Sequence, residues 1–187
     1  MRWTTILVLG FLAPLPVVGQ TADDLDLVAP ALEAAVSDAT ERAKSGEVPY
    51  APKKVWLESD SFREVFGSFP DLQIVDFLSH ASLLNPGLAR KDSVVSCREM
   101  EGRIAGECAV AENGMVVSII SLDRRSTRSA AVKVEYLMPT PGHRFAPLCP
   151  RRLLVEMERE DQPRETGEVR GTPGAWTVSE VEVLTQC

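Results

Sequence analysis

The sequence predicts an α+β fold in which two or three N-terminal helices pack on an antiparallel sheet of about six strands. The helices are predicted by apolar residues that recur at helical spacing in the first third of the chain. The sheet is predicted by short segments of alternating polarity, separated by turns, from residue 91 onward. With 187 residues, of which 44% are hydrophobic, the chain fits one domain over residues 20–187, helical in 20–90 and β in 91–187.

Residues 1–19 have the pattern of a secretory signal peptide. Arg2 is the only charged residue before Asp23, and the apolar run 6–13 that follows it is ended by two prolines. This run is shorter than the roughly 20 apolar residues that a membrane span needs. We expect cleavage before Gln20, no lipid anchor because no cysteine lies nearby, and no membrane span in the mature chain. The expected location is therefore periplasmic or secreted.

The four cysteines of an exported chain predict two disulfide bonds. The Gly-Arg pair at 102–103 lies between two strand-like segments and suits the centre of a two-residue hairpin turn. Facing residues of that hairpin have numbers that sum to 205, as do Cys97 and Cys108. The predicted pairs are therefore Cys97 with Cys108 and Cys149 with Cys187. No spacing among cysteines and histidines is typical of a metal site.

The first helix is predicted by one apolar stripe. Its apolar residues recur every three or four positions: Leu25, Val28, Leu32, Val36, Ala39 and Ala43. Gly46 is typical of a helix end, and Pro30 either lies in the first turn or kinks a longer helix. Ser61 and Glu64 form a capping signature for a second helix. Residues 72–78 suit a third helix or a strand.

The second half of the chain is expected to form a meander. Asn113 and Gly114 are a strong hairpin signal, whereas residues 47–57 are expected to be a link. A slip in the apolar alternation between Val178 and Val181 predicts a bulge in the last strand. Strands are expected over residues 94–100, 104–110, 115–122, 129–138, 153–157 and 176–183.

Helices followed by antiparallel strands are also the element order of cystatin-like and NTF2-like cones. The strands need cover for one apolar face, and the amphipathic N-terminal helices are the available cover. The comparison is an architectural analogy, because no sequence motif supports it.

Positive charge is concentrated in the second half of the chain. Residues 124–152 contain seven lysines and arginines and one acid. If the turn after residue 123 and the loop around Cys149 meet at one end of the sheet, their arginines form a surface for carboxylate or phosphate groups. The candidate binding residues are Arg124, Arg125, Arg128, His143, Arg144, Phe145, Arg151 and Arg152. The favoured alternative is that these arginines neutralise acids of the chain itself, such as Glu156 and Glu158.

No catalytic signature accompanies these residues. The chain has no G-x-S-x-G, phosphate-binding glycine loop or H-E-x-x-H motif, and only His80 and His143 could act as the base of a triad. We therefore predict no catalytic residue, metal or cofactor. The net charge of −7 argues against a nucleic-acid partner.

Our leading hypothesis is an exported, soluble binding or interaction protein without catalytic activity. Its partner would be a protein or a small anionic ligand at the arginine-rich loop end. One alternative is a small enzyme that carries out acid–base chemistry in a pocket, which a deep cavity around a titratable group would favour. The other is a structural subunit of an envelope assembly, which an exposed apolar stripe on the N-terminal helix would favour.

Overall fold

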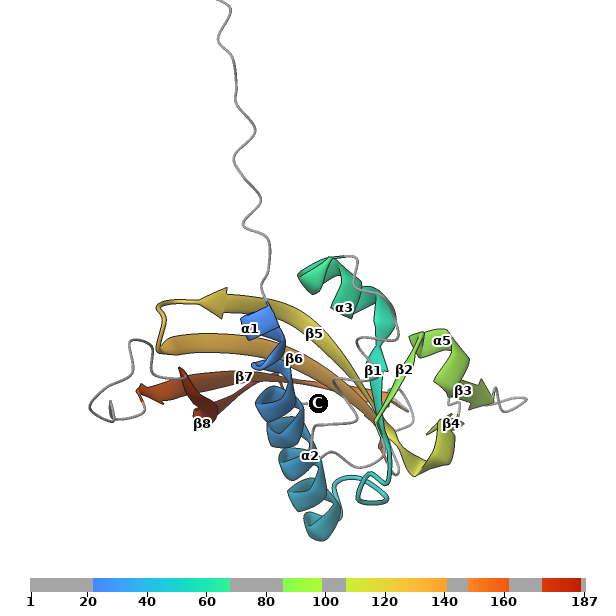
Figure 1. Ribbon diagram of the computed structural model, residues 1–187. Coiled ribbons are helices and arrows are strands. Elements are labelled where there is room, and N and C mark those ends of the chain that lie inside the picture. The colour runs from blue at the N-terminus through green and yellow to red at the C-terminus, as the bar shows by residue number, and fades with distance from the viewer. Residues whose placement is uncertain (1–21, 68–85, 99–106, 141–147, 162–172, 186–187) are drawn as a thin grey trace, which may run out of the picture.

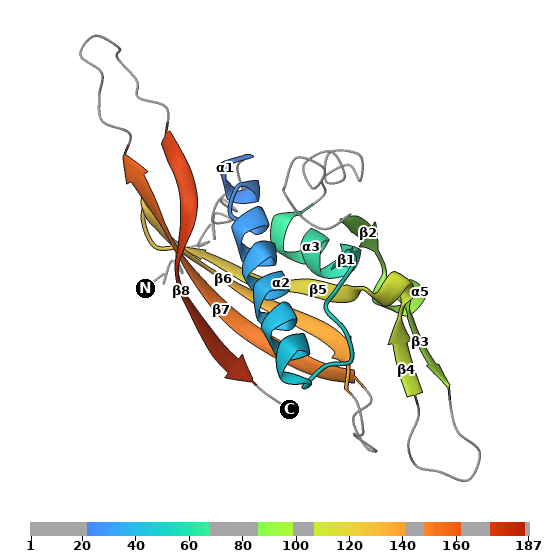
Figure 2. The same ribbon diagram turned by 90° about the horizontal axis from the view of Figure 1, so that it is seen from below.

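The computed structural model describes residues 22–67, 86–98, 107–140, 148–161 and 173–185. One long helix lies across a six-stranded sheet, and a small two-stranded sheet projects from one end of the molecule (Figures 1 and 2). The helices are α1 (Ala22–Leu25), α2 (Val28–Ser45), α3 (Ser59–Phe66), α5 (Lys91–Val94) and the 3₁₀ turn η1 (Ala111–Asn113). The strands are β1 (Val55–Glu58), β2 (Gly87–Ala89), β3 (Val95–Arg98), β4 (Glu107–Val110), β5 (Met115–Arg124), β6 (Ser129–Pro139), β7 (Leu148–Asp161) and β8 (Pro173–Thr185). The predicted α+β class is confirmed.

Helix α2 covers the sheet with the apolar stripe that its sequence predicts. Its buried apolar residues are Val28, Ala31, Leu32, Ala35 and Ala39. Pro30 lies in the first turn, where its missing N–H leaves no helical hydrogen bond unmade. Gly46 ends the helix in the left-handed region with φ 79°, as expected, and its N–H donates to Ala43 O. No helix in the described ranges is long and apolar enough to cross a membrane.

Strands β5 to β8 form the predicted antiparallel meander, but the sheet as a whole is mixed. The strand order is β2-β1-β5-β6-β7-β8, and β1 is parallel to both of its neighbours. Strand β1 lies where we expected a link and, like β2, within the region expected to be helical. Both expectations were wrong. Strand β1 has only four residues, of which Val55 and Leu57 are buried, and so short an alternation does not distinguish a strand from a link.

The predicted disulfide between Cys97 and Cys108 is confirmed. The two residues face each other in the β3–β4 ladder, and their Cα atoms lie 4.0 Å apart. The hairpin forms a two-stranded sheet of its own, however, and is not part of the large sheet. The turn at 102–103 lies outside the described residues.

The second predicted disulfide remains a prediction. Cys187 and the side chain of Cys149 lie outside the part of the chain that the structure describes. The β7–β8 ladder pairs Arg152 with Thr185, so the described end of β8 lies opposite a residue three positions after Cys149. The segments at 1–19 and 72–78 and His80 are also outside the described ranges.

Two local predictions, one of a turn and one of a helix cap, differ from the structure. Gly114 has φ −89°, and the left-handed residues of the turn are Glu112 and Asn113. This turn does not make a β4–β5 hairpin, because β5 pairs with β1 and β6 instead. The α3 cap also differs: Glu58 caps the helix by accepting the N–H of Ser61 at 3.3 Å, so the cap precedes the predicted Ser61 signature by three residues.

Gly114 is required because two backbone oxygens approach it. A Cβ atom there would lie 2.9 Å from Lys54 O and 3.0 Å from Ala111 O. Lys54 O accepts the N–H of Met115 and Ala111 O accepts the N–H of Gly114, so neither oxygen can move away without loss of a hydrogen bond. Gly114→Ala is therefore expected to destabilise the fold by about 1–3 kcal/mol. Urea unfolding checks this result. Asn113→Gly is the control and is expected to be neutral or mildly stabilising, because Asn113 is left-handed. Equal stability of Gly114→Ala and the wild type would contradict the prediction.

Candidate functional site

Four of the predicted binding arginines are paired with acids of the same chain. The ion pairs are Arg124–Asp24 at 2.7 Å, Arg125–Glu156 at 2.9 Å, Arg151–Asp38 at 2.7 Å and Arg152–Glu135 at 2.7 Å. Arg128 is exposed, and its backbone N–H donates to Ser126 Oγ. His143, Arg144 and Phe145 lie outside the described residues. The described pairs agree with the alternative in which the arginines neutralise the protein's own acids.

The structure does not bring the two groups of arginines together. Arg124 faces Ala130 near the start of β6, whereas Arg151 faces Tyr136 close to its end. Six residues of strand separate these positions, which corresponds to about 20 Å. The condition for a single arginine surface, that both groups meet at one end of the sheet, is therefore not met by the described arginines.

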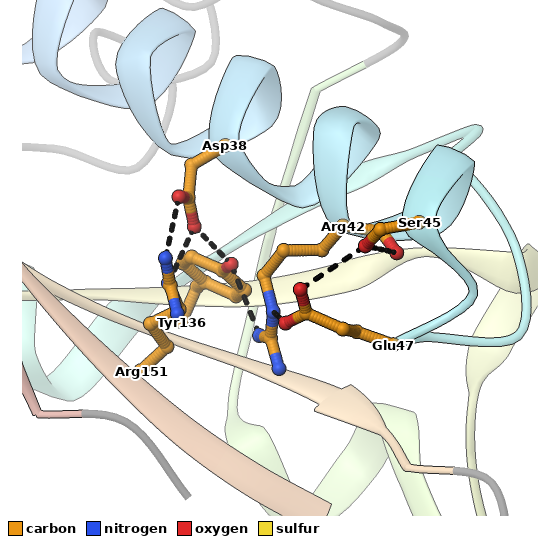
Figure 3. A network of polar contacts seen from close by, with 6 residues as sticks. All are labelled: Asp38, Arg42, Ser45, Glu47, Tyr136 and Arg151. Carbon is orange, nitrogen blue, oxygen red and sulfur yellow. Dashed lines mark hydrogen bonds and ion pairs between the residues drawn. The ribbon is translucent and has the colours of Figure 1, made fainter.

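A network of polar side chains lies between α2 and the sheet (Figure 3). Asp38 extends from α2 and accepts Arg151 Nη2 at 2.9 Å on one oxygen. Its other oxygen lies 2.7 Å from Arg151 Nε and accepts the Tyr136 hydroxyl hydrogen. Arg42, one helical turn further along α2, donates to Tyr136 Oη from Nη1 at 3.2 Å. Hydrogen bonds from Tyr136 on β6 and Arg151 on β7 to Asp38 thereby join α2 to these two strands.

The same cluster ends at the C-terminus of α2. Arg42 Nε lies 3.0 Å from Glu47 Oε2, and Ser45 Oγ donates to Glu47 Oε1 at 3.1 Å. We call the six residues of Figure 3 the Asp38 cluster: Asp38, Arg42, Ser45, Glu47, Tyr136 and Arg151. It contains two cations and two carboxylates, so its formal charge is zero. Tyr136 is fully buried and Arg42 is 6% exposed, so this part of the cluster joins α2 to the sheet, whereas the side chain of Glu47 is 45% exposed.

The pKa values of the cluster follow from this burial. Burial raises the pKa of Tyr136 well above its usual value near 10, and the hydrogen bond to Asp38 raises it further. For Arg42, burial acts to lower the pKa, but hydrogen bonds with Tyr136 and Glu47 outweigh it and raise the pKa. The hydrogen bond from Arg42 lowers the pKa of Glu47.

We expect neither tyrosine of the folded protein to ionise near pH 10. The chain has two tyrosines, and burial also raises the pKa of Tyr50. A raised folded pKa means that the contribution of neutral Tyr136 to stability is complete below its unfolded pKa of about 10 and is lost as the pH rises through the folded pKa. Tyrosinate absorbance and urea unfolding, measured over an alkaline pH series, test this expectation. Tyr136→Phe should flatten the loss, and reversible ionisation of both tyrosines near pH 10 would contradict it.

An open cleft of about 450 Å³ lies beside the confirmed disulfide. Its lining residues are Glu58, Asp60, Arg90, Lys91, Asp92, Val95 and Cys97. Arg90 Nε lies 3.6 Å from Asp60 and 3.8 Å from Asp92, so acids and bases of the cleft partly neutralise one another. Burial raises the pKa of Tyr136, but this residue lies in the core and not in the cleft. Within the described ranges, no group of three or more His, Cys, Asp or Glu side chains is placed to hold a metal ion.

Strand β8 is a sheet edge with exposed apolar side chains. Its Val178, Val181 and Val183 face Met157, Val155 and Leu153 of β7, which are fully buried. The three valines, which we call the β8 valine row, are nevertheless 40–41% exposed. The predicted bulge is confirmed, since the register shifts at Ser179. The β8 valine row therefore continues the apolar face of the sheet beyond the part that is buried.

The sequence prediction missed both the Asp38 cluster and the exposure of β8. Asp38 and Arg42 are spaced four apart on α2 and lie on the side that also buries Ala35 and Ala39. Charged residues on the apolar side of a helix are a usable signal for a buried ion pair. The β8 valines offer no such signal, because strand alternation is the same whether the face is covered or open.

Comparisons of the chain with models of protein families, with curated proteins and with solved structures find no match in any of the three. Arg124, Arg125, Arg151 and Arg152 pair with acids of the chain itself, the cleft beside the disulfide is open, and β8 carries the exposed apolar row.

Proposed function

We propose that the chain is exported and acts outside the cytoplasm as a binding protein without catalytic activity, whose partner contacts the β8 valine row. The observation that carries this proposal is the exposure of Val178, Val181 and Val183 at 40–41%, on the same face as fully buried residues of β7. Apolar side chains gathered on one open edge favour contact with another molecule.

Export is supported by the signal-like residues 1–19 and by the Cys97–Cys108 disulfide. In this proposal the mature chain begins at Gln20 and carries a second disulfide between Cys149 and Cys187. Its architecture would be cystatin-like, because one long helix packs on a four-stranded meander. N-terminal sequencing of the mature protein and peptide mapping without reductant test the first two points. An intact leader, or free thiols at Cys97 and Cys108, would contradict export.

The contact surface of this proposal differs from the arginine-rich end. Arg124, Arg125, Arg151 and Arg152 pair with acids of the chain, so a partner would have to displace those acids. The enzyme alternative gains little from an open cleft with mutually paired charges. The subunit alternative requires an exposed apolar stripe on α2, and that stripe is buried against the sheet.

Site-specific photo-crosslinking in the native host tests the contact surface. A crosslinking side chain at Val181 should give a discrete adduct, whereas one at the exposed Ser121 on β5 should not. A second substitution, Val178→Lys, should abolish the Val181 adduct, because a lysine on the valine row opposes an apolar partner. Ser121→Lys adds the same charge on another strand and should leave the adduct unchanged. An adduct that survives Val178→Lys, or no adduct from Val181, would contradict the proposal.

A further inference from the structure

The free edge of β8 contains a regular stretch of four residues that lies between two bulges. The ladder with β7 is interrupted at Ser179 and again at Leu184, so Glu180–Val183 keeps continuous register. This stretch reads Glu, Val, Glu, Val. Because successive side chains of a strand point to opposite faces, its two valines lie on the face that carries α2 and its two glutamates on the other face.

The backbone of this stretch is positioned to accept another strand. Strand β8 is the last in the sheet order, so within the described residues its outer N–H and C=O groups have no neighbouring strand. An extended segment that pairs with such an edge gains main-chain hydrogen bonds, and its alternate side chains contact the two faces of the sheet. The β8 valine row would supply the apolar contacts of such a segment.

The two glutamates determine the charge of the segment that fits. Glu180 and Glu182 are exposed and make no ion pair among the described residues, whereas the neighbouring Glu156 is held by Arg125. A second copy of β8 paired antiparallel would place glutamate opposite glutamate, which is unfavourable for directly facing residues. Lysine or arginine in those facing positions would be favourable.

We propose that β8 accepts an extended partner segment as an added strand, and that this segment alternates apolar residues with lysine or arginine. This inference rests on the proposed function, which places the partner at β8, and adds the binding mode and the chemistry of the partner. The apolar side chains extend the β8 valine row, and the cations face Glu180 and Glu182.

A labelled peptide of about eight residues that alternates lysine and valine is the direct probe. Its fluorescence anisotropy is measured against the full mature, oxidised chain. We expect saturable binding, and we expect neutralisation by E180Q and E182Q together to weaken it about fivefold. The matched control is E33Q with E64Q, which removes two exposed acids of α2 and α3 and should leave the affinity unchanged. A peptide that alternates glutamate and valine should not bind.

The added strand itself is tested through the backbone. N-methylation of alternate peptide residues, in each of the two possible phases, keeps the side chains but removes backbone donors, and one phase should abolish binding. Bound peptide should also slow amide exchange in Glu180–Val183, with no change in the middle of α2.

The possible results separate this inference from the proposed function. If E33Q with E64Q weakens peptide binding as much as E180Q with E182Q does, the peptide is attracted to the acidic protein in general, and the inference is overturned. Full binding by both N-methylated peptides overturns the added strand. If the Val181 adduct forms in the native host but the lysine–valine peptide does not bind, the partner class is wrong while the contact surface stands. If that adduct does not form, the proposed function itself fails.

Discussion

Replacing Asp38 with alanine is expected to destabilise the fold by about 3–5 kcal/mol, because it leaves a buried guanidinium without its carboxylate. The side chain of Arg151 is 9% exposed; its Nη2 donates to one oxygen of Asp38, and its Nε lies 2.7 Å from the other oxygen. The variant also removes the acceptor of the buried Tyr136 hydroxyl. The change is measured as the free energy of unfolding in urea.

Two further variants separate a buried pair from a general helix effect. Glu41→Ala on the exposed side of α2 should change stability by no more than about 0.5 kcal/mol, since Glu41 is 66% exposed and its ion pair with Lys44 is equally exposed. Asp38→Ala combined with Arg151→Met should recover much of the loss, because the second change removes the stranded charge. If Asp38→Ala costs no more than Glu41→Ala, the Asp38 cluster does not hold α2 to the sheet.

The elements that the sequence predicts well are those with local patterns. The α2 stripe repeats over 18 residues and ends at a left-handed glycine, and both features are local. The Cys97–Cys108 pairing follows from a short hairpin, where turn position determines register. The bulge at Ser179 is visible because it shifts the apolar alternation of β8 by one residue.

The elements that the sequence does not predict depend on distant contacts. Strand β1 has four residues and pairs with β5, so that Val55 faces Met115, sixty positions later in the chain. No local periodicity indicates such a parallel pairing. The Asn113-Gly114 signal fails for the same reason, since β5 finds its partners in β1 and β6 and not in the preceding strand.

The candidate site was likewise predictable only where its pattern is local. The sequence shows that arginines are concentrated between residues 124 and 152, but not which acids they meet. Arg151 is held by Asp38, which is 113 positions away on a helix, and Arg124 by Asp24 of α1. Arg125 pairs with Glu156, one of the acids that the sequence suggested as partners.

The contrast between two facing residues gives the second large effect. Leu153 of β7 and Val183 of β8 face each other in the ladder and point to the same face of the sheet, but only Leu153 is fully buried. Leu153→Ala is expected to destabilise the fold by about 2–5 kcal/mol through the lost transfer energy and the cavity left behind. Val183→Ala should cost about 1 kcal/mol or less, since Val183 is 41% exposed. Both are measured as free energies of unfolding in urea.

This difference bears directly on what the β8 valine row is for. Under the proposed function, an apolar side chain whose removal hardly changes folding, but which lies on an otherwise buried face, contacts the partner and not the core. Val183→Ala should therefore weaken binding of the lysine–valine peptide while leaving the fold intact, and Leu153→Ala should act on stability first. If Val183→Ala costs as much stability as Leu153→Ala, the β8 valine row belongs to the core and does not serve to dock a partner.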